Sequence, residues 1–145
     1  MFDLDAVEPS RVTWLYRPFL ARGKLHLLVG YSSVNKSTLM CALAATISTG
    51  GFWPSGERMA SRGSVLLIGC EDDKADTLVP RLQAAGADLK KIKYANKITI
   101  AEKPEYIDFS SSLHRDVLRN TVDVTGDLVA IFVDPIVSFM GRRRQ

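Results

Sequence analysis

Three short apolar runs constrain the fold of this chain more than any other feature of its sequence. They are residues 24–29 (KLHLLV), 64–68 (SVLLI) and 127–133 (DLVAIFV), and each is followed by small, polar or acidic residues. Continuous apolar runs of this length are typical of parallel strands that are covered on both faces. We therefore expect three buried strands.

Helical patterns separate these runs. From Lys36, apolar residues recur at helical spacing until Gly50 and Gly51, which predicts a helix that ends at the glycines. Strands that alternate with helices indicate an α/β fold with a mostly parallel sheet. The remaining expected elements are helices over about 74–85 and, with a serine cap, about 110–120, a short strand at 98–100 and a loop at 101–109.

Composition places the chain among ordinary globular proteins. It has 145 residues, of which 46% are apolar and 24% charged, so a packed core is expected rather than disorder. The net charge of +3 permits an acidic partner without requiring one. Cys41 and Cys70 each lie in an apolar run and are expected to be small buried residues. Since no secretory signal and no run of about 18 apolar residues is apparent, a soluble cytoplasmic protein with no membrane partner is expected.

A candidate phosphate-binding loop lies between the first apolar run and the first helical pattern. Its sequence, GYSSVNKS at residues 30–37, stands between a predicted strand and a predicted helix. A phosphate-binding loop requires this context, because the backbone N–H groups at the helix N-terminus bind the anion. Lys36 is placed to reach the β- and γ-phosphates, and the Ser37 hydroxyl to bind Mg²⁺. The expected nucleotide-binding residues are Gly30, Ser32, Ser33, Val34, Asn35, Lys36, Ser37 and Thr38.

Asn35 stands where the usual phosphate-loop pattern has glycine. Glycine suits that position because the backbone approaches phosphate closely there, sometimes with a positive φ. Asparagine tolerates this conformation better than most residues, so the loop is still expected to form. Because the side chain would intrude toward the phosphates, weakened nucleotide binding is expected.

Two acidic residues follow the second and third apolar runs. In open α/β sheets, ligands bind at the carboxyl ends of the strands. Asp134 is expected to hold Mg²⁺ there, and Glu71 to orient and deprotonate an attacking water. A helix cap for Asp134 and a solvated loop carboxylate for Glu71 are the alternatives.

Several segments together resemble the AAA-type, RecA-like ATPases related to plasmid RepA replicative helicases. The resemblance extends from about Trp14 to Phe139 and rests on RGKL at 22–25, STGGFWP at 48–54, RGSVLLI at 62–68, EDD at 71–73, RLQAAGA at 81–87 and VDPI at 133–136. It implies a three-layer P-loop NTPase fold, ATP and Mg²⁺ as ligands and ATP hydrolysis, with hexameric assembly and DNA unwinding in full-length relatives. By position, Lys36 and Ser37 match the Walker A pair, Asp134 the Walker B aspartate and Glu71 the catalytic glutamate.

The resemblance also implies a domain organisation. Residues 1–22 are expected to be a lead-in that packs on the core, 23–140 a partial RecA-like domain truncated after the Walker B strand, and 141–145 a basic tail. In relatives a later strand lies between the Walker A and Walker B strands. Its position would be open here, unless the strand ending at Asp134 pairs directly with the one ending at Val29. The alternatives to an ATPase module of a DNA replication helicase are a binding-only or inert remnant of one and, less favoured, a small P-loop kinase.

Overall fold

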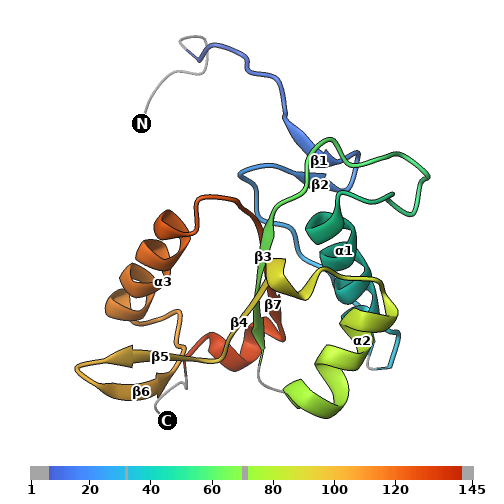
Figure 1. The fold of residues 1–145 in the computed structure, drawn as a ribbon. Coiled ribbons are helices and arrows are strands. Elements are labelled where there is room, and N and C mark those ends of the chain that lie inside the picture. The colour runs from blue at the N-terminus through green and yellow to red at the C-terminus, as the bar shows by residue number, and fades with distance from the viewer. Residues whose placement is uncertain (1–6, 32, 70–71, 142–145) are drawn as a thin grey trace. The chain divides into compact units, whose positions relative to one another are not determined.

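The computed structural model of the protein describes residues 7–31, 33–69 and 72–141. The chain divides into two compact units, residues 1–31 and residues 32–145. The first unit holds a small antiparallel hairpin of β1 (Trp14–Tyr16) and β2 (Leu20–Ala21). The second unit holds the parallel sheet, shown with its helices in Figure 1.

Residues 24–29 do not form the strand that their composition predicts, so this prediction is wrong. They have no regular secondary structure, and Leu25 is 96% exposed. An apolar run becomes a strand only where a neighbouring strand pairs with its backbone N–H and C=O groups. In the described part of the chain, no sheet includes these residues.

A three-stranded parallel sheet forms the centre of the second unit. β3 (Ser64–Gly69) lies between β4 (Ile92–Ala95) and β7 (Leu128–Asp134). Residues 65–68 of β3 are almost completely buried, as their unbroken apolar sequence predicts. The runs at 64–68 and 127–133 are thus confirmed as strands of a parallel sheet. Their direct pairing and β4 were not expected, and β7 is only half-buried, so the prediction of a buried third strand is wrong.

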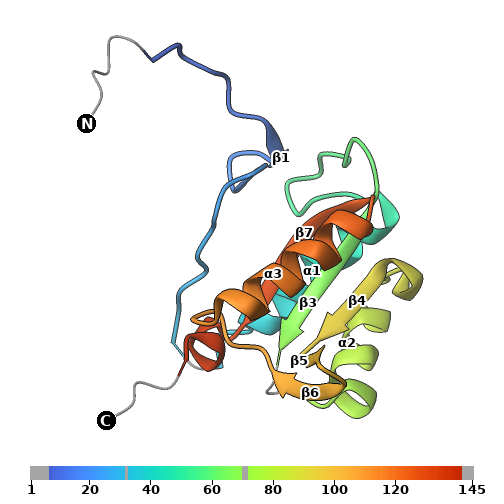
Figure 2. The ribbon, with the colours of Figure 1, turned by 90° about the vertical axis from the view of Figure 1, so that its left-hand side faces the viewer.

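Helices cover both faces of this sheet. α1 (Lys36–Thr49) and α2 (Val79–Ala84) lie on one face and α3 (Ser112–Val124) on the other, as Figures 1 and 2 show from two directions. η2 (Lys74–Leu78), a π-helical turn, leads directly into α2. The short 3₁₀ segments η3 (Leu89–Lys91) and η4 (Ile136–Phe139) precede β4 and follow β7. This mixed α/β arrangement with a parallel sheet is compatible with a P-loop-type fold.

The helix ends agree with the sequence signals. Gly50 follows α1 with a φ of 69°, and its N–H donates to the Thr46 carbonyl, so glycine ends this helix as expected. The Ser111 hydroxyl accepts a hydrogen bond from the His114 N–H, which is the serine cap expected for α3. α3 ends at Val124, one turn beyond its expected end.

The segment predicted as a loop at 101–109 contains a strand, so that prediction is wrong in part. β6 (Lys103–Tyr106) pairs antiparallel with β5 (Lys97–Ile100). Its sequence, KPEY, has no alternation of apolar and polar residues, so it gives no strand signal. All four of its side chains are exposed. Pairing with β5, rather than burial, accounts for this strand.

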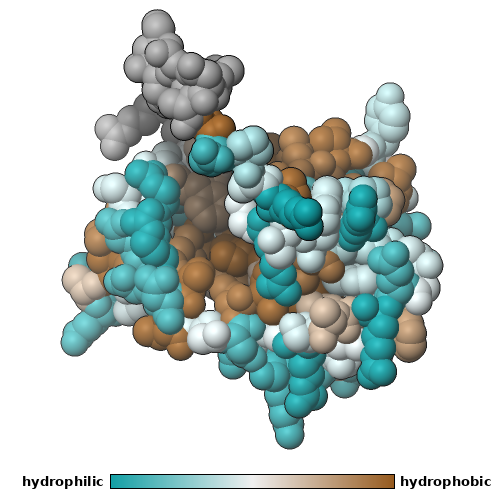
Figure 3. Space-filling view, turned by 90° about the horizontal axis from the view of Figure 1, so that it is seen from above, coloured by the Kyte–Doolittle hydropathy of each residue, from teal (hydrophilic) through white to brown (hydrophobic). Residues whose placement is uncertain are grey.

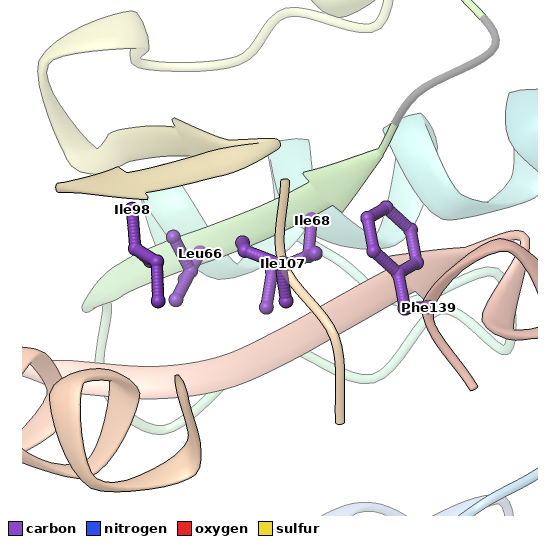
Figure 4. Close-up of a cluster of buried hydrophobic side chains, with 5 residues drawn as sticks. All are labelled: Leu66, Ile68, Ile98, Ile107 and Phe139. Atoms are coloured by element: carbon purple, nitrogen blue, oxygen red, sulfur yellow. The ribbon is translucent and has the colours of Figure 1, made fainter. Parts of the chain in front are cut away.

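A hydrophobic cluster joins the hairpin of β5 and β6 to the parallel sheet. Leu66 and Ile68 of β3 contact Ile98 of β5, Ile107 and Phe139, and all five are at most 8% exposed (Figure 4). Partly buried residues of α3 pack against this cluster. Since alternate residues of a strand face opposite sides, β3 presents the remaining apolar residues to α1 and α2.

β7 forms one edge of the parallel sheet within the described residues. β3 is its strand neighbour there, and Ile131 of β7 is 46% exposed. Of the two arrangements expected for this strand, a free edge and direct pairing with a strand at 24–29, the described residues have the free edge. Figure 3 shows hydrophobic residues, in brown, at the surface among hydrophilic ones in teal.

Candidate functional site

The side chains of Ser37 and Asp134 meet where α1 begins and β7 ends. The Ser37 hydroxyl donates a hydrogen bond of 2.6 Å to Asp134 Oδ2. Ser37 is the second residue of α1, and Asp134 is the last residue of β7, opposite Gly69 of β3. The parallel sheet therefore brings a hydroxyl and a carboxylate together at the carboxyl ends of its strands, where α/β proteins bind ligands.

The loop that leads into α1 has the left-handed backbone that a glycine would favour. Ser33 has a φ of 65° and Asn35 a φ of 61°. The usual phosphate-loop pattern has glycine at position 35. Asparagine tolerates this region and serine less readily, so the loop retains its course at a modest cost in strain.

The first turn of α1 is not capped by the side chain before it. Asn35 is the N-cap residue, but its side chain makes no capping hydrogen bond. Acidic residues are also absent from this turn. The partial positive charge of the helix N-terminus therefore lies beside the Ser37 hydroxyl without a compensating carboxylate of its own turn.

The remaining predicted site residues are distributed between described and undescribed parts of the chain. Lys36 opens α1 and is half-buried, whereas Val34 and Thr38 are exposed. Gly30 belongs to the first unit, whose placement relative to the second is not determined. Ser32 and Glu71 lie outside the described residues, as do Cys70 and most of the predicted basic tail.

A small hollow opens beside the Ser37–Asp134 pair. Its polar lining consists of these two residues with Gly69, Asp72 and Tyr94. Tyr94 was not singled out from the sequence, because it lies on the unexpected strand β4 and its partner is a backbone carbonyl. The pattern of 92–95 (IKYA) carries no signal of a functional residue.

A family comparison decides the broad identity of the chain. The family model described as "AAA domain" matches residues 1–144. The chain belongs to the AAA domain family. No curated protein and no solved structure matches it in the corresponding comparisons. Membership makes this protein an ATPase-type, nucleotide-binding module.

The donors of this AAA domain suit Mg²⁺ better than a transition metal. The described residues contain no cluster of three or more His, Cys, Asp or Glu side chains that could hold a metal alone. Mg²⁺ needs no such cluster, because it is usually bound by one or two protein oxygens together with phosphate oxygens and water. Ser37 and Asp134 supply two oxygens of this kind.

An ion pair and a buried thiol lie near this site of the AAA domain. Arg81 of α2 binds Asp72 at 2.6 Å, so the Asp72 carboxylate in the hollow already has a cationic partner. Burial raises the pKa of the Cys41 thiol, an effect that the Arg81 charge partly opposes. Cys41 is therefore a neutral, buried residue of α1, as expected from its apolar surroundings. Among the described helices, none is both long and apolar enough to cross a membrane.

Proposed function

We propose that this AAA domain binds ATP with Mg²⁺ through the loop at 33–37 and Asp134, and hydrolyses it. The observation that carries the proposal is the hydrogen bond between Ser37 and Asp134. These oxygens lie 97 positions apart in sequence and belong to the two elements that a P-loop NTPase uses to hold Mg²⁺.

Binding of the triphosphate is assigned to the start of α1. The helix N-terminus attracts anions, and Lys36 adds a cation at the same end of the helix. The positive φ values of Ser33 and Asn35 support a loop that curves around an anion. The Asn35 side chain occupies space that glycine would leave to phosphate, so moderate affinity is expected.

Hydrolysis is assigned to Glu71, which follows β3 in the sequence by two residues. A carboxylate at this strand end is suited to accept a proton from an attacking water. Mg²⁺, when bound, would offset the charge that develops on the phosphate oxygens. Ser37 and Asp134 would hold the ion, and Lys36 would contact the terminal phosphates.

The wider role that we propose is the ATPase module of a RecA-like replicative helicase. This part rests on the segments that resemble RepA-type enzymes between about Trp14 and Phe139. It includes assembly of several copies, with six in relatives, and contact with DNA. DNA-stimulated ATP turnover and a hexameric mass would support it, and a monomer indifferent to DNA would contradict it.

A titration with the fluorescent nucleotide mant-ATP tests the ATPase proposal directly. We expect the wild type to bind mant-ATP more tightly with Mg²⁺ than with EDTA, and to release phosphate from ATP. Lys36→Ala should weaken binding by at least about tenfold, roughly the effect of losing one charge-assisted hydrogen bond. Lys90→Ala is the matched control, since it removes an exposed lysine from η3, which does not line the hollow at the candidate site.

Glu71→Gln separates hydrolysis from binding. Phosphate release that disappears in this variant, with mant-ATP affinity unchanged, supports an ATPase with Glu71 as its base. A wild type that binds nucleotide without turnover supports the second candidate, a binding-only module, which the departure at Asn35 favours. Absence of Mg²⁺-dependent binding in the wild type would contradict both.

A further inference from the structure

Tyr94 connects two neighbouring strands at the rim of the candidate site. Its hydroxyl donates a hydrogen bond of 2.6 Å to the carbonyl oxygen of Gly69. Tyr94 is on β4, and Gly69 is the last residue of β3. Tyr94 itself pairs with Leu67, and its hydroxyl reaches Gly69, one residue past the last ladder residue of β3, Ile68.

The ring of Tyr94 also packs against Gly69. A Cβ atom added at Gly69 would lie 3.5 Å from Tyr94 Cε2 and 3.4 Å from the Asp134 carbonyl oxygen. Tyr94 and Asp134 therefore both lie close to Gly69, on the two strands that flank β3. Gly69 is hydrogen-bonded to Tyr94 and pairs with Asp134, so it connects the two.

Two further contacts hold this region. The Lys74 ammonium lies 5.0 Å from the centre of the Tyr94 ring, a cation–π distance that favours one ring orientation. Asp72, which lines the same hollow as Tyr94, is bound by Arg81. The described residues on both sides of positions 70–71 are therefore each fixed by a side chain from another element.

We propose that Tyr94 is a positioning residue for the ATPase reaction, acting through Gly69 on Asp134. The inference rests on the proposed function, because it gives Tyr94 its purpose at the Mg²⁺ site. Strand ends separate easily where the ladder stops, and the phenol replaces the missing ladder bond at Gly69. The carboxylate of Asp134 then stays at hydrogen-bond distance from Ser37, ready to hold the metal.

Tyr94→Phe tests this role, because it removes one hydroxyl and keeps the ring that packs on Gly69. We expect kcat for ATP to fall by about tenfold or more, since displacements near 1 Å in a catalytic assembly cost up to about a hundredfold. Tightening of mant-ATP binding by Mg²⁺ should also diminish. Affinity in EDTA should stay within about twofold, because Tyr94 does not belong to the phosphate loop.

Tyr106→Phe is the matched control. Tyr106 lies on β6, is 64% exposed and has Lys97 over its ring, so it also combines a phenol with a nearby lysine. Its hydroxyl can be removed without touching the candidate site. We expect kcat, the Mg²⁺ effect and the melting temperature of this variant to match the wild type.

The outcomes distinguish this inference from the proposed function. If the wild type shows no Mg²⁺-dependent nucleotide binding, the proposed function fails and the role of Tyr94 fails with it. If the wild type binds as proposed, and Tyr94→Phe lowers only the melting temperature while kcat and the Mg²⁺ effect persist, Tyr94 is merely structural and the inference is overturned. If the wild type binds nucleotide without turnover, kcat cannot be compared. The test is then whether Tyr94→Phe diminishes the tightening of mant-ATP binding by Mg²⁺, as the inference requires, or leaves it unchanged, which overturns it.

Discussion

The Ser37 hydroxyl and the Asp134 carboxylate are joined by a hydrogen bond of 2.6 Å that connects the start of α1 to the end of β7. Asp134→Asn keeps an oxygen that can accept this hydrogen bond and removes the negative charge. The fold should therefore persist, whereas an ion bound through that charge should be lost. We expect Mg²⁺ no longer to tighten mant-ATP binding, with affinity in EDTA unchanged or improved.

Asp116→Asn serves as the control for Asp134→Asn. Asp116 lies on α3 and forms an exposed pair with Arg119, remote in sequence from the candidate site. Surface pairs of this kind contribute at most about 1 kcal/mol to stability. If Asp134→Asn retains the full Mg²⁺ effect, the assignment of Asp134 as a metal-binding residue is wrong.

Asn35→Gly should strengthen nucleotide binding. Asn35 holds a φ of 61° and its side chain makes no capping hydrogen bond, so glycine would lose little and would relieve the left-handed conformation. We expect mant-ATP to bind several-fold more tightly, by roughly 0.5–1 kcal/mol, from removal of that strain and of the side chain. Fluorescence titration measures the change.

Asn35→Ala is the informative counterpart. Alanine adds no polar group but keeps a Cβ in the left-handed region, which costs about 1–2 kcal/mol relative to the ordinary helical conformation. Affinity and melting temperature should both fall below those of the wild type. Equal affinities for the glycine and alanine variants would show that the backbone conformation at position 35 does not limit binding.

The sequence predicts best those elements whose burial matches their pattern. β3 is apolar at residues 65–68 and buried on both faces, α1 ends at its glycine signal, and α3 begins after its serine signal. Residues 24–29 have the same apolar character without a strand in the described structure. A pattern records which side chains avoid water, but strand formation also requires a backbone partner, which one segment alone cannot reveal.

The candidate site shows the same limit. Ser37 and Asp134 could be expected on one rim, because strand ends and helix starts converge there in parallel sheets. Their roles toward Mg²⁺ remain predictions. Tyr94 could not be found from the sequence, since its bond to Gly69 depends on the register of β3 and β4. Side chains that bind backbone carbonyls of other strands carry no motif.

Acid should weaken the fold through Asp127. The hydrogen bond from the Lys91 ammonium, followed by one from the Ser64 hydroxyl, holds the pKa of Asp127 below its ordinary value. A carboxyl with a lowered pKa stabilises the folded state above its unfolded pKa of about 3.9, and that contribution disappears as the pH falls through the folded pKa. Asp127→Asn should therefore lower the melting temperature at pH 6, and this effect should shrink as the pH falls below about 3.9.

A double-mutant cycle identifies the cause of this pH dependence. Lys91→Met removes the ammonium and keeps most of the apolar stem, so Asp127→Asn made in that background should lower the melting temperature less. An undiminished effect would assign the stabilisation to Ser64 or to the unfolded state rather than to the Lys91–Asp127 pair.

Gly63→Ala should be the most destabilising single-methyl change near the sheet. A Cβ at Gly63 would lie 2.2 Å from Val129 Cγ2 and 2.6 Å from the Asp127 carbonyl oxygen. The chain just before β3 would therefore have to move away from the start of β7. Overpacking of this kind costs about 1–3 kcal/mol, and urea denaturation should show the loss. Gly126→Ala is the control, because nothing lies within 4 Å of its added Cβ and its φ is not left-handed. It should leave stability unchanged or raise it by up to about 1 kcal/mol, and equal losses in both variants would contradict a steric cause at Gly63.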